Sequence, residues 1–139
     1  MKIMVSACLL GENCKYSGGN NRDARVLAFI EGHEIIPVCP EVMGGLPTPR
    51  LPAEIVSGEV INCEGVSVDR EFRLGAQKAL EIAVQEKIDL AILQSRSPSC
   101  GTKEIYDGTF SGEKIPGRGV FAGMLMDHGF AVLDREDVK

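Results

Sequence analysis

Short apolar segments alternate with helical segments along most of the chain, and this alternation limits the possible folds more than any other feature. Segments 2–7, 34–38, 89–94 and 130–133 are short and mostly apolar, as is typical of buried strands. Segments 22–31, 69–87 and 120–128 place apolar residues at helical spacing. The pattern predicts an α/β fold with a mainly parallel four-stranded sheet. Right-handed connections would put helices on both faces, in a Rossmann-like arrangement.

The connections between these segments are long and rich in Gly and Pro. For the sheet we predict the strand order second, first, third, fourth, which places a topological switch point beside the first strand. Segment 39–54 holds four prolines and is predicted to be a stiff loop without regular structure. Segment 55–68 is predicted to form small extended pieces or a hairpin, and 95–119 a polar loop. Asn21 is the expected cap of helix 22–31.

Length, charge and cysteine content limit the number of domains, the partners and the cellular location that we expect. The 139 residues suit one domain, so we expect a single domain over 1–139. Lys and Arg total 15 against 20 Asp and Glu, a formal charge of −5, which makes nucleic acid an unlikely partner. No apolar run approaches the roughly 20 residues of a membrane-spanning helix, so no membrane association is expected. Five cysteines without a secretion signal predict a cytoplasmic protein.

Three of the five cysteines follow predicted strands. Cys8 comes after the first strand, Cys39 after the second, and Cys100 a few residues after the third. Because the carboxyl ends of parallel strands share one edge of the sheet, these thiols are expected to converge there. Three thiolates suit an iron–sulfur cluster, or zinc with a fourth ligand. Cys14 and Cys63 are interpreted as core filler or surface residues.

The neighbours of these cysteines also carry chemistry. Glu41 lies two residues beyond Cys39 and is a candidate acid or base. Ser95, Ser97 and Ser99 precede Cys100 and offer hydroxyl donors. Arg50 is expected to pair with an anion or with Glu54, and the turn 105–112 to close over the same edge of the sheet.

The ordered strings VSACLLG, CKYSGG, VCPEVMGGLPTPR, SPSCG, IYDGTFSG and GRGVFAGML resemble the domain of unknown function family 523 over about residues 3–133. Characterised members of that family are similar to thiouracil desulfurases, or desulfidases. The resemblance implies a [4Fe-4S] cluster bound by Cys8, Cys39 and Cys100, with one iron open, and a small-molecule thiolated nucleobase that is converted to uracil and sulfide. It also implies that Glu41 is the catalytic carboxylate, assisted by Ser97 with Ser95 behind it.

Two other functions remain open from the residues alone. The first is a zinc- or thiol-dependent hydrolase with Cys100 as nucleophile, although activated thiols usually have a nearby histidine. The second is a non-catalytic module that binds an iron–sulfur cluster or another metal. His33 and His128 are interpreted as residues at helix ends rather than as catalytic groups.

Overall fold

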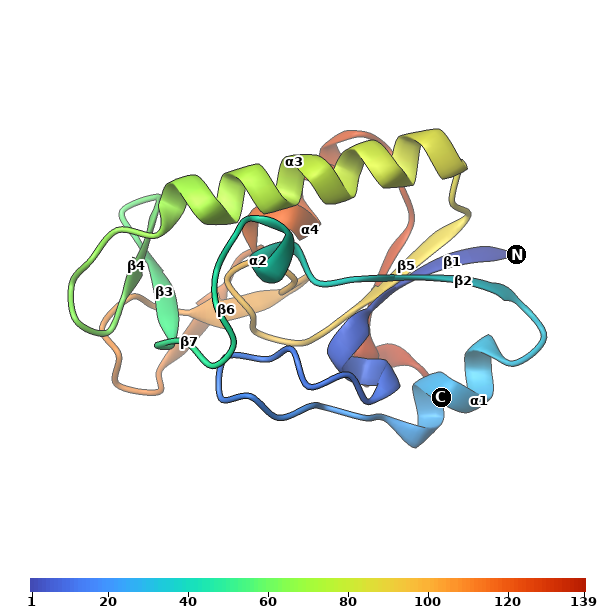
Figure 1. The fold of residues 1–139 in the computed structure, drawn as a ribbon, viewed down its shortest axis with the longest axis horizontal. Coiled ribbons are helices and arrows are strands. Elements are labelled where there is room, and N and C mark those ends of the chain that lie inside the picture. The colour runs from blue at the N-terminus through green and yellow to red at the C-terminus, as the bar shows by residue number, and fades with distance from the viewer.

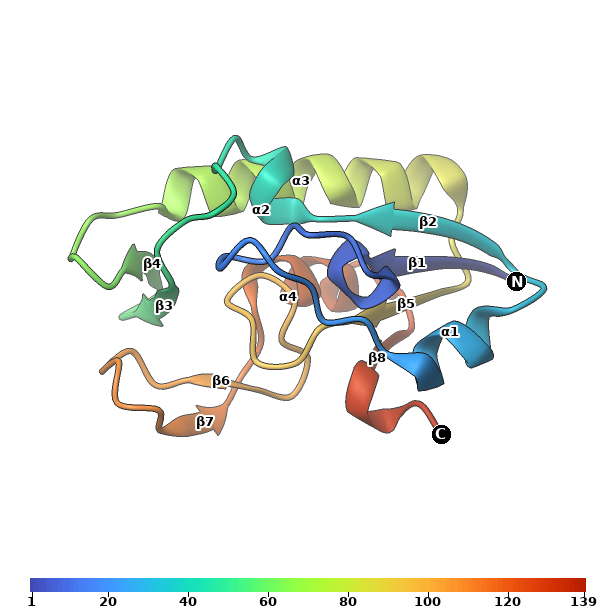
Figure 2. The same ribbon diagram turned by 60° about the horizontal axis from the view of Figure 1, so that its bottom comes forward.

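A four-stranded parallel sheet forms the centre of the protein, which the computed structural model describes over residues 1–139. Three of its strands are β1 (Lys2–Ser6), β2 (Glu34–Val38) and β5 (Leu90–Leu93) (Figure 1). With β8 (Val132–Asp134) the order is β2-β1-β5-β8 (Figure 2). This confirms the predicted α/β class and strand order. β1 is therefore an inner strand, in register with β2 from Lys2 and Glu34 to Ser6 and Val38.

Helices cover both faces of this sheet because successive side chains of β1 point to opposite sides. Met4 packs under α3 (Asp69–Glu86) and α4 (Val120–Asp127), in a core that includes Leu80 and Phe121. Ile3 and Val5 pack on the other face, where α1 (Ala24–Ile30), the turn η1 (Ala7–Leu10) and the C-terminal turn η2 (Arg135–Asp137) lie (Figure 2). No helix is both long enough and apolar enough to cross a membrane.

The loops contain more regular structure than the sequence predicts. Within 39–54, predicted to be irregular, Pro40–Met43 form one helical turn, α2, because a proline fits the first position of a helix. The predicted hairpin at 55–68 is present as β3 (Ala53–Val56) and β4 (Glu59–Asn62). The polar loop 95–119 contains a second hairpin, β6 (Glu104–Tyr106) and β7 (Lys114–Pro116).

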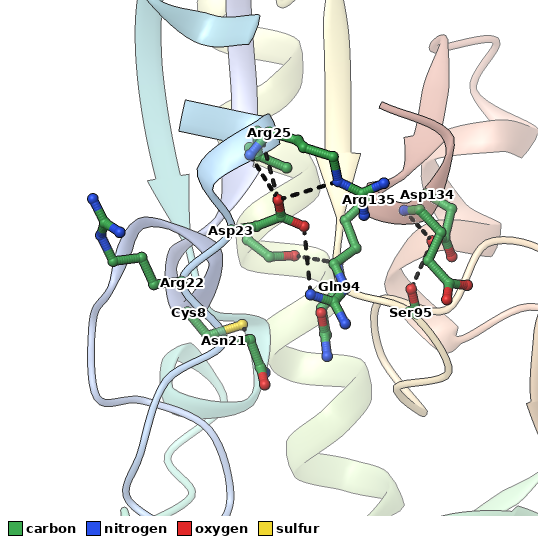
Figure 3. Close-up of polar contacts among 12 residues, drawn as sticks. Cys8, Asn21, Arg22, Asp23, Arg25, Gln94, Ser95, Asp134 and Arg135 are labelled. Carbon is green, nitrogen blue, oxygen red and sulfur yellow. Dashed lines mark hydrogen bonds and ion pairs between the residues drawn. The ribbon is translucent and has the colours of Figure 1, made fainter. Parts of the chain in front are cut away.

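The cap of α1 is a correction. Asp23, rather than the predicted Asn21, caps this helix, and its carboxylate accepts hydrogen bonds from the backbone of Arg25 and Val26. Asp23 also accepts a hydrogen bond from Arg135, which ties α1 to the C-terminal turn (Figure 3). An ionised carboxylate serves both contacts at once, whereas an amide would lack the charge that the arginine needs.

α2 packs against α3 with almost no space between the two backbones. A side chain at Gly44 would overlap the carbonyl of Glu71, and one at Gly75 would overlap the carbonyl of Pro40. The two glycines therefore let the main chains touch, which fixes the position of the segment that starts at Cys39. This contact connects the long helix α3 to the residues at the end of β2.

We predict that Gly75→Ala destabilises the protein by about 3 kcal/mol, because the added methyl group forces α2 away from α3. Urea unfolding measures the change. Gly123→Ala in α4 is the matched control, since no atom beyond its chain neighbours and its own helix backbone lies within 4 Å of its new Cβ. That variant should be neutral or more stable by up to about 1 kcal/mol. Equal stability of the two variants would contradict the close packing of α2 on α3.

Candidate functional site

A cavity of about 500 Å³ opens at the carboxyl ends of β1, β2 and β5. Cys8, Cys39 and Cys100 all line it, together with Glu41 and Arg50. The sheet thus brings three segments that are far apart in the sequence to one cavity. The tip of the β6–β7 hairpin contributes Phe110 and Gly112, so this hairpin also reaches the cavity, as the sequence suggested.

Cys8 lies in the turn η1, directly after β1, and is buried. Asn21 holds it in place: its side-chain amide donates to the Cys8 sulfur over 3.5 Å, and its backbone N–H donates to the Cys8 carbonyl over 2.9 Å (Figure 3). Burial raises the pKa of the Cys8 thiol, and the hydrogen bond from Asn21 opposes that rise. Asn21, predicted to be a helix cap, instead contacts the Cys8 sulfur.

Cys100 is the most deeply enclosed of the three thiols. Burial raises its pKa to about 12, against hydrogen bonds from the hydroxyls of Ser6 and Ser99 that lower it. Ser6 also accepts the backbone N–H of Gln94 over 3.0 Å. The Ser6 hydroxyl at the end of β1 thus connects the end of β5 to the Cys100 thiol. The sequence pattern does not predict this role of Ser6.

Cys39 stands at the start of α2 and beside Cys14. Its sulfur lies 3.7 Å from the Cys14 carbonyl, and the neighbouring Cys14 thiol lowers the pKa of Cys39, while Cys39 raises the pKa of Cys14. Cys14 packs partly buried against the hydrophobic cluster of Ile3 and Val5, as expected of core filler, and it also lines the cavity. Cys63 is exposed and lies outside it.

Glu41 is fixed from both sides of its carboxylate. Its Oε1 accepts the Nε–H of Arg50 over 3.1 Å, and its Oε2 accepts the hydroxyl of Ser99 over 3.1 Å and that of Ser97 over 3.5 Å. The side chain of Arg50 is only 6% exposed, and it also donates to the carbonyl of Cys14 over 2.9 Å. Of the two expected partners of Arg50, an anion or Glu54, the structure shows an anionic group, the carboxylate of Glu41.

The serines before Cys100 divide into two groups. Ser97 accepts the backbone N–H groups of Ser99 and Cys100, each over 3.0 Å, and so shapes the turn that carries the thiol. Ser99 contacts Glu41 more closely than Ser97 does, although the sequence favoured Ser97. The Ser95 hydroxyl instead donates to the buried carboxylate of Asp134 over 2.6 Å (Figure 3). This contact indicates a structural role for Ser95.

The groups around the cavity include thiols, hydroxyls and the carboxylates of Glu41 and Glu54, and no histidine lines it. No three His, Cys, Asp or Glu side chains gather closely enough to hold one metal ion together. A group bound by all three cysteines would have to be larger than a single ion. Gln94 also lines the cavity, and its side-chain oxygen is buried without a hydrogen-bond partner.

We predict that iodoacetamide at pH 8 modifies Cys39 at least about tenfold faster than Cys100 in the metal-free protein. The thiolate is the reactive form, and the Cys14 thiol lowers the pKa of Cys39 while burial raises that of Cys100. Peptide mass mapping over time measures the order, with exposed Cys63 as internal standard. Cys14→Ala should slow the modification of Cys39. Equal rates at Cys39 and Cys100 would contradict these environments.

Comparisons with known proteins show the family of the chain. Residues 3–137 match the family model described as 2-thiouracil desulfurase. The uncharacterized protein YbbK of Bacillus subtilis (strain 168) is 36% identical over 147 aligned positions, which cover 99% of this chain and 97% of that protein. The solved structure of the [4Fe-4S]-dependent thiouracil desulfidase TudS matches with a TM-score of 0.92 and 40% identity, over 99% of this chain and 92% of that one. The chain therefore belongs to the 2-thiouracil desulfurase family.

Proposed function

We propose that this protein is a desulfidase that hydrolyses thiolated uracil, so that thiouracil and water give uracil and hydrogen sulfide. The observation that carries the proposal is the meeting of three thiols, Glu41 and two serines at one cavity. Membership of the 2-thiouracil desulfurase family supports it, as does the likeness to a [4Fe-4S]-dependent thiouracil desulfidase.

The residues of the cavity fit a [4Fe-4S] cluster. Cys8, Cys39 and Cys100 would hold it, because such clusters are bound by cysteine thiolates. The cysteines of a cubane bind different irons, so they stand farther apart than the ligands of one ion, in keeping with the lack of a tight single-ion group. When bound by three cysteines, the cluster supplies one open iron, a Lewis acid that suits a thiocarbonyl sulfur.

The protein's own contribution centres on Glu41. Arg50 occupies Oε1 of the carboxylate, which leaves Oε2 directed at the serine hydroxyls. We assign to Oε2 the removal of a proton from the attacking water, and to Ser97 and Ser99 the alignment of that water or of the ring's polar atoms. Cys100 lines the cavity and is buried, so its thiol has little contact with bulk water.

The alternative of a thiol nucleophile has less support. Cys100 would have to attack as a thiolate, yet burial raises its pKa to about 12. An adjacent base usually activates such a thiol, and the cavity has no histidine. A purely structural metal module would not need a carboxylate oriented by a buried arginine.

The decisive experiment is anaerobic reconstitution with iron and sulfide, followed by an assay of uracil and sulfide released from 2-thiouracil. Glu41→Gln should bind the same amount of iron as the wild type and lose at least about 100-fold in kcat, because the amide cannot accept the proton. Glu113→Gln, an exposed position outside the cavity, is the matched control and should stay within about twofold. Full turnover by Glu41→Gln would refute the role of Glu41, and lack of turnover by the wild type would refute the function.

A second prediction concerns the residue that orients Glu41. Arg50→Lys should lower kcat about tenfold with little change in KM, because an ammonium group cannot reproduce the planar contacts to Glu41 and the Cys14 carbonyl. In the Glu41→Gln background the same substitution should cause no further loss of kcat. Arg73→Lys, in an exposed ion pair with Asp69, is the control. Additive losses in the double variant would show that Arg50 acts independently of Glu41.

A further inference from the structure

The turn between β6 and β7 places a strained aromatic residue at the rim of the cavity. Phe110 has a φ of +57°, in the left-handed region that bulky side chains rarely adopt. Its side chain lines the cavity, and the residue is 39% exposed. Phe110 belongs to neither hydrophobic core. The conformation is therefore not explained by packing of the ring inside the protein.

The strained turn is fastened to β3 by one carboxylate. Oε1 of Glu54 accepts the backbone N–H of Gly108 over 3.0 Å and that of Phe110 over 3.2 Å. Gly108 approaches β3 so closely that a Cβ there would lie 2.7 Å from the Ile55 carbonyl. The two hairpins lie together at the same end of the sheet (Figure 2). The backbone that carries Phe110 is thus held in place, not free to swing.

Within the turn, a second carboxylate fixes the chain just before Phe110. Oδ1 of Asp107 accepts the backbone N–H of Thr109 over 2.9 Å and its hydroxyl over 2.6 Å. Two side chains therefore organise a turn whose one apolar member faces the cavity. Such strain is characteristic of ligand-binding segments, where the surrounding structure fixes an uncommon backbone conformation.

We propose that Phe110 is the stacking surface for the pyrimidine ring of the substrate, and that Glu54 is the positioning residue that presents it. This inference rests on the function proposed above, because it assigns a flat aromatic base to the cavity. A base has an apolar face that needs an aromatic partner, and its polar edge matches the hydroxyls and carboxylate deeper in the cavity. Tyr106 on β6 also lines the cavity.

The kinetic test uses the cluster-loaded enzyme with 2-thiouracil. Phe110→Ala should raise KM about tenfold, as expected for the loss of one base–aromatic stack. Phe110→Tyr keeps the ring and should restore KM to within about twofold. Ile115→Ala is the matched control, because Ile115 is an exposed apolar residue of the same hairpin that does not line the cavity. An unchanged KM in Phe110→Ala would overturn the proposal.

A binding measurement separates stacking from turnover. The chain has no tryptophan, so Phe110→Trp introduces a single tryptophan at the turn, which excitation at the red edge of the absorption band selects over the two tyrosines. Titration of the loaded variant with uracil, which is not consumed, should change its emission in a saturable way. Ile115→Trp should show no saturable change. An equal response of the two variants would overturn the proposal.

The role of Glu54 is tested through Phe110. Glu54→Ala should raise KM about as much as Phe110→Ala, and Glu54→Gln should restore it because the amide keeps an acceptor oxygen for both N–H groups. The double variant Phe110→Ala/Glu54→Ala should be no worse than either single one. An additive loss would refute positioning by Glu54. If the wild type releases no sulfide, the proposed function is refuted. If the wild type releases sulfide and Phe110→Ala keeps the wild-type KM, only the stacking role is refuted.

Discussion

The parallel pairing of β1 with β2 and β5 is the constraint on which the rest of the molecule depends. Ser6 is in register with Val38, so the chain leaves β1 and β2 at the same level and delivers Cys8 and Cys39 to one edge. β5 joins on the other side of β1, and the Ser6 hydroxyl continues the contact beyond the last strand residues by binding both the Gln94 N–H and the Cys100 sulfur. A shift of one residue in either pairing would move the thiols apart and turn the buried side chains of β1 toward the wrong face.

Buried charge is used in two separate ways. Asp134 and Asp23 accept hydrogen bonds that tie the C-terminal turn to the loop of Ser95 and to α1, and these contacts hold the fold. Glu41 is instead oriented by Arg50 toward hydroxyls that line the cavity. All three serines of this loop line the cavity, but the Ser95 hydroxyl donates to Asp134, whereas those of Ser97 and Ser99 donate to Glu41. Their spacing of two residues along an irregular segment places them in different surroundings.

The sequence was sufficient for the strand order and for the convergence of the three cysteine segments, because hydrophobic periodicity and the geometry of parallel sheets determine both. It was not sufficient for contacts between side chains of different loops. No local sequence pattern indicates that Cys14 lies beside Cys39, because the two residues are 25 positions apart and meet only in the folded chain. Glu41 and Glu54 both lie near Arg50 in the sequence. Only the path of the proline-rich loop shows that Arg50 binds Glu41. The second hairpin was missed because its strands are three residues long, too short for a periodic pattern. The ligand and catalytic roles of Cys8, Cys39, Cys100, Glu41 and Ser97 stay predictions.

The position of β1 in the middle of the sheet has a consequence for biosynthesis. Its neighbours come from residues 34–38 and 90–93, and the third thiol follows at residue 100. A nascent chain that has emerged only as far as α3 has two of the three sulfurs. Its strand β1 still has an unpaired edge, and the side of the cavity that follows β5 is missing. Maturation with any prosthetic group that needs all three sulfurs must therefore wait until Cys100 has left the ribosome.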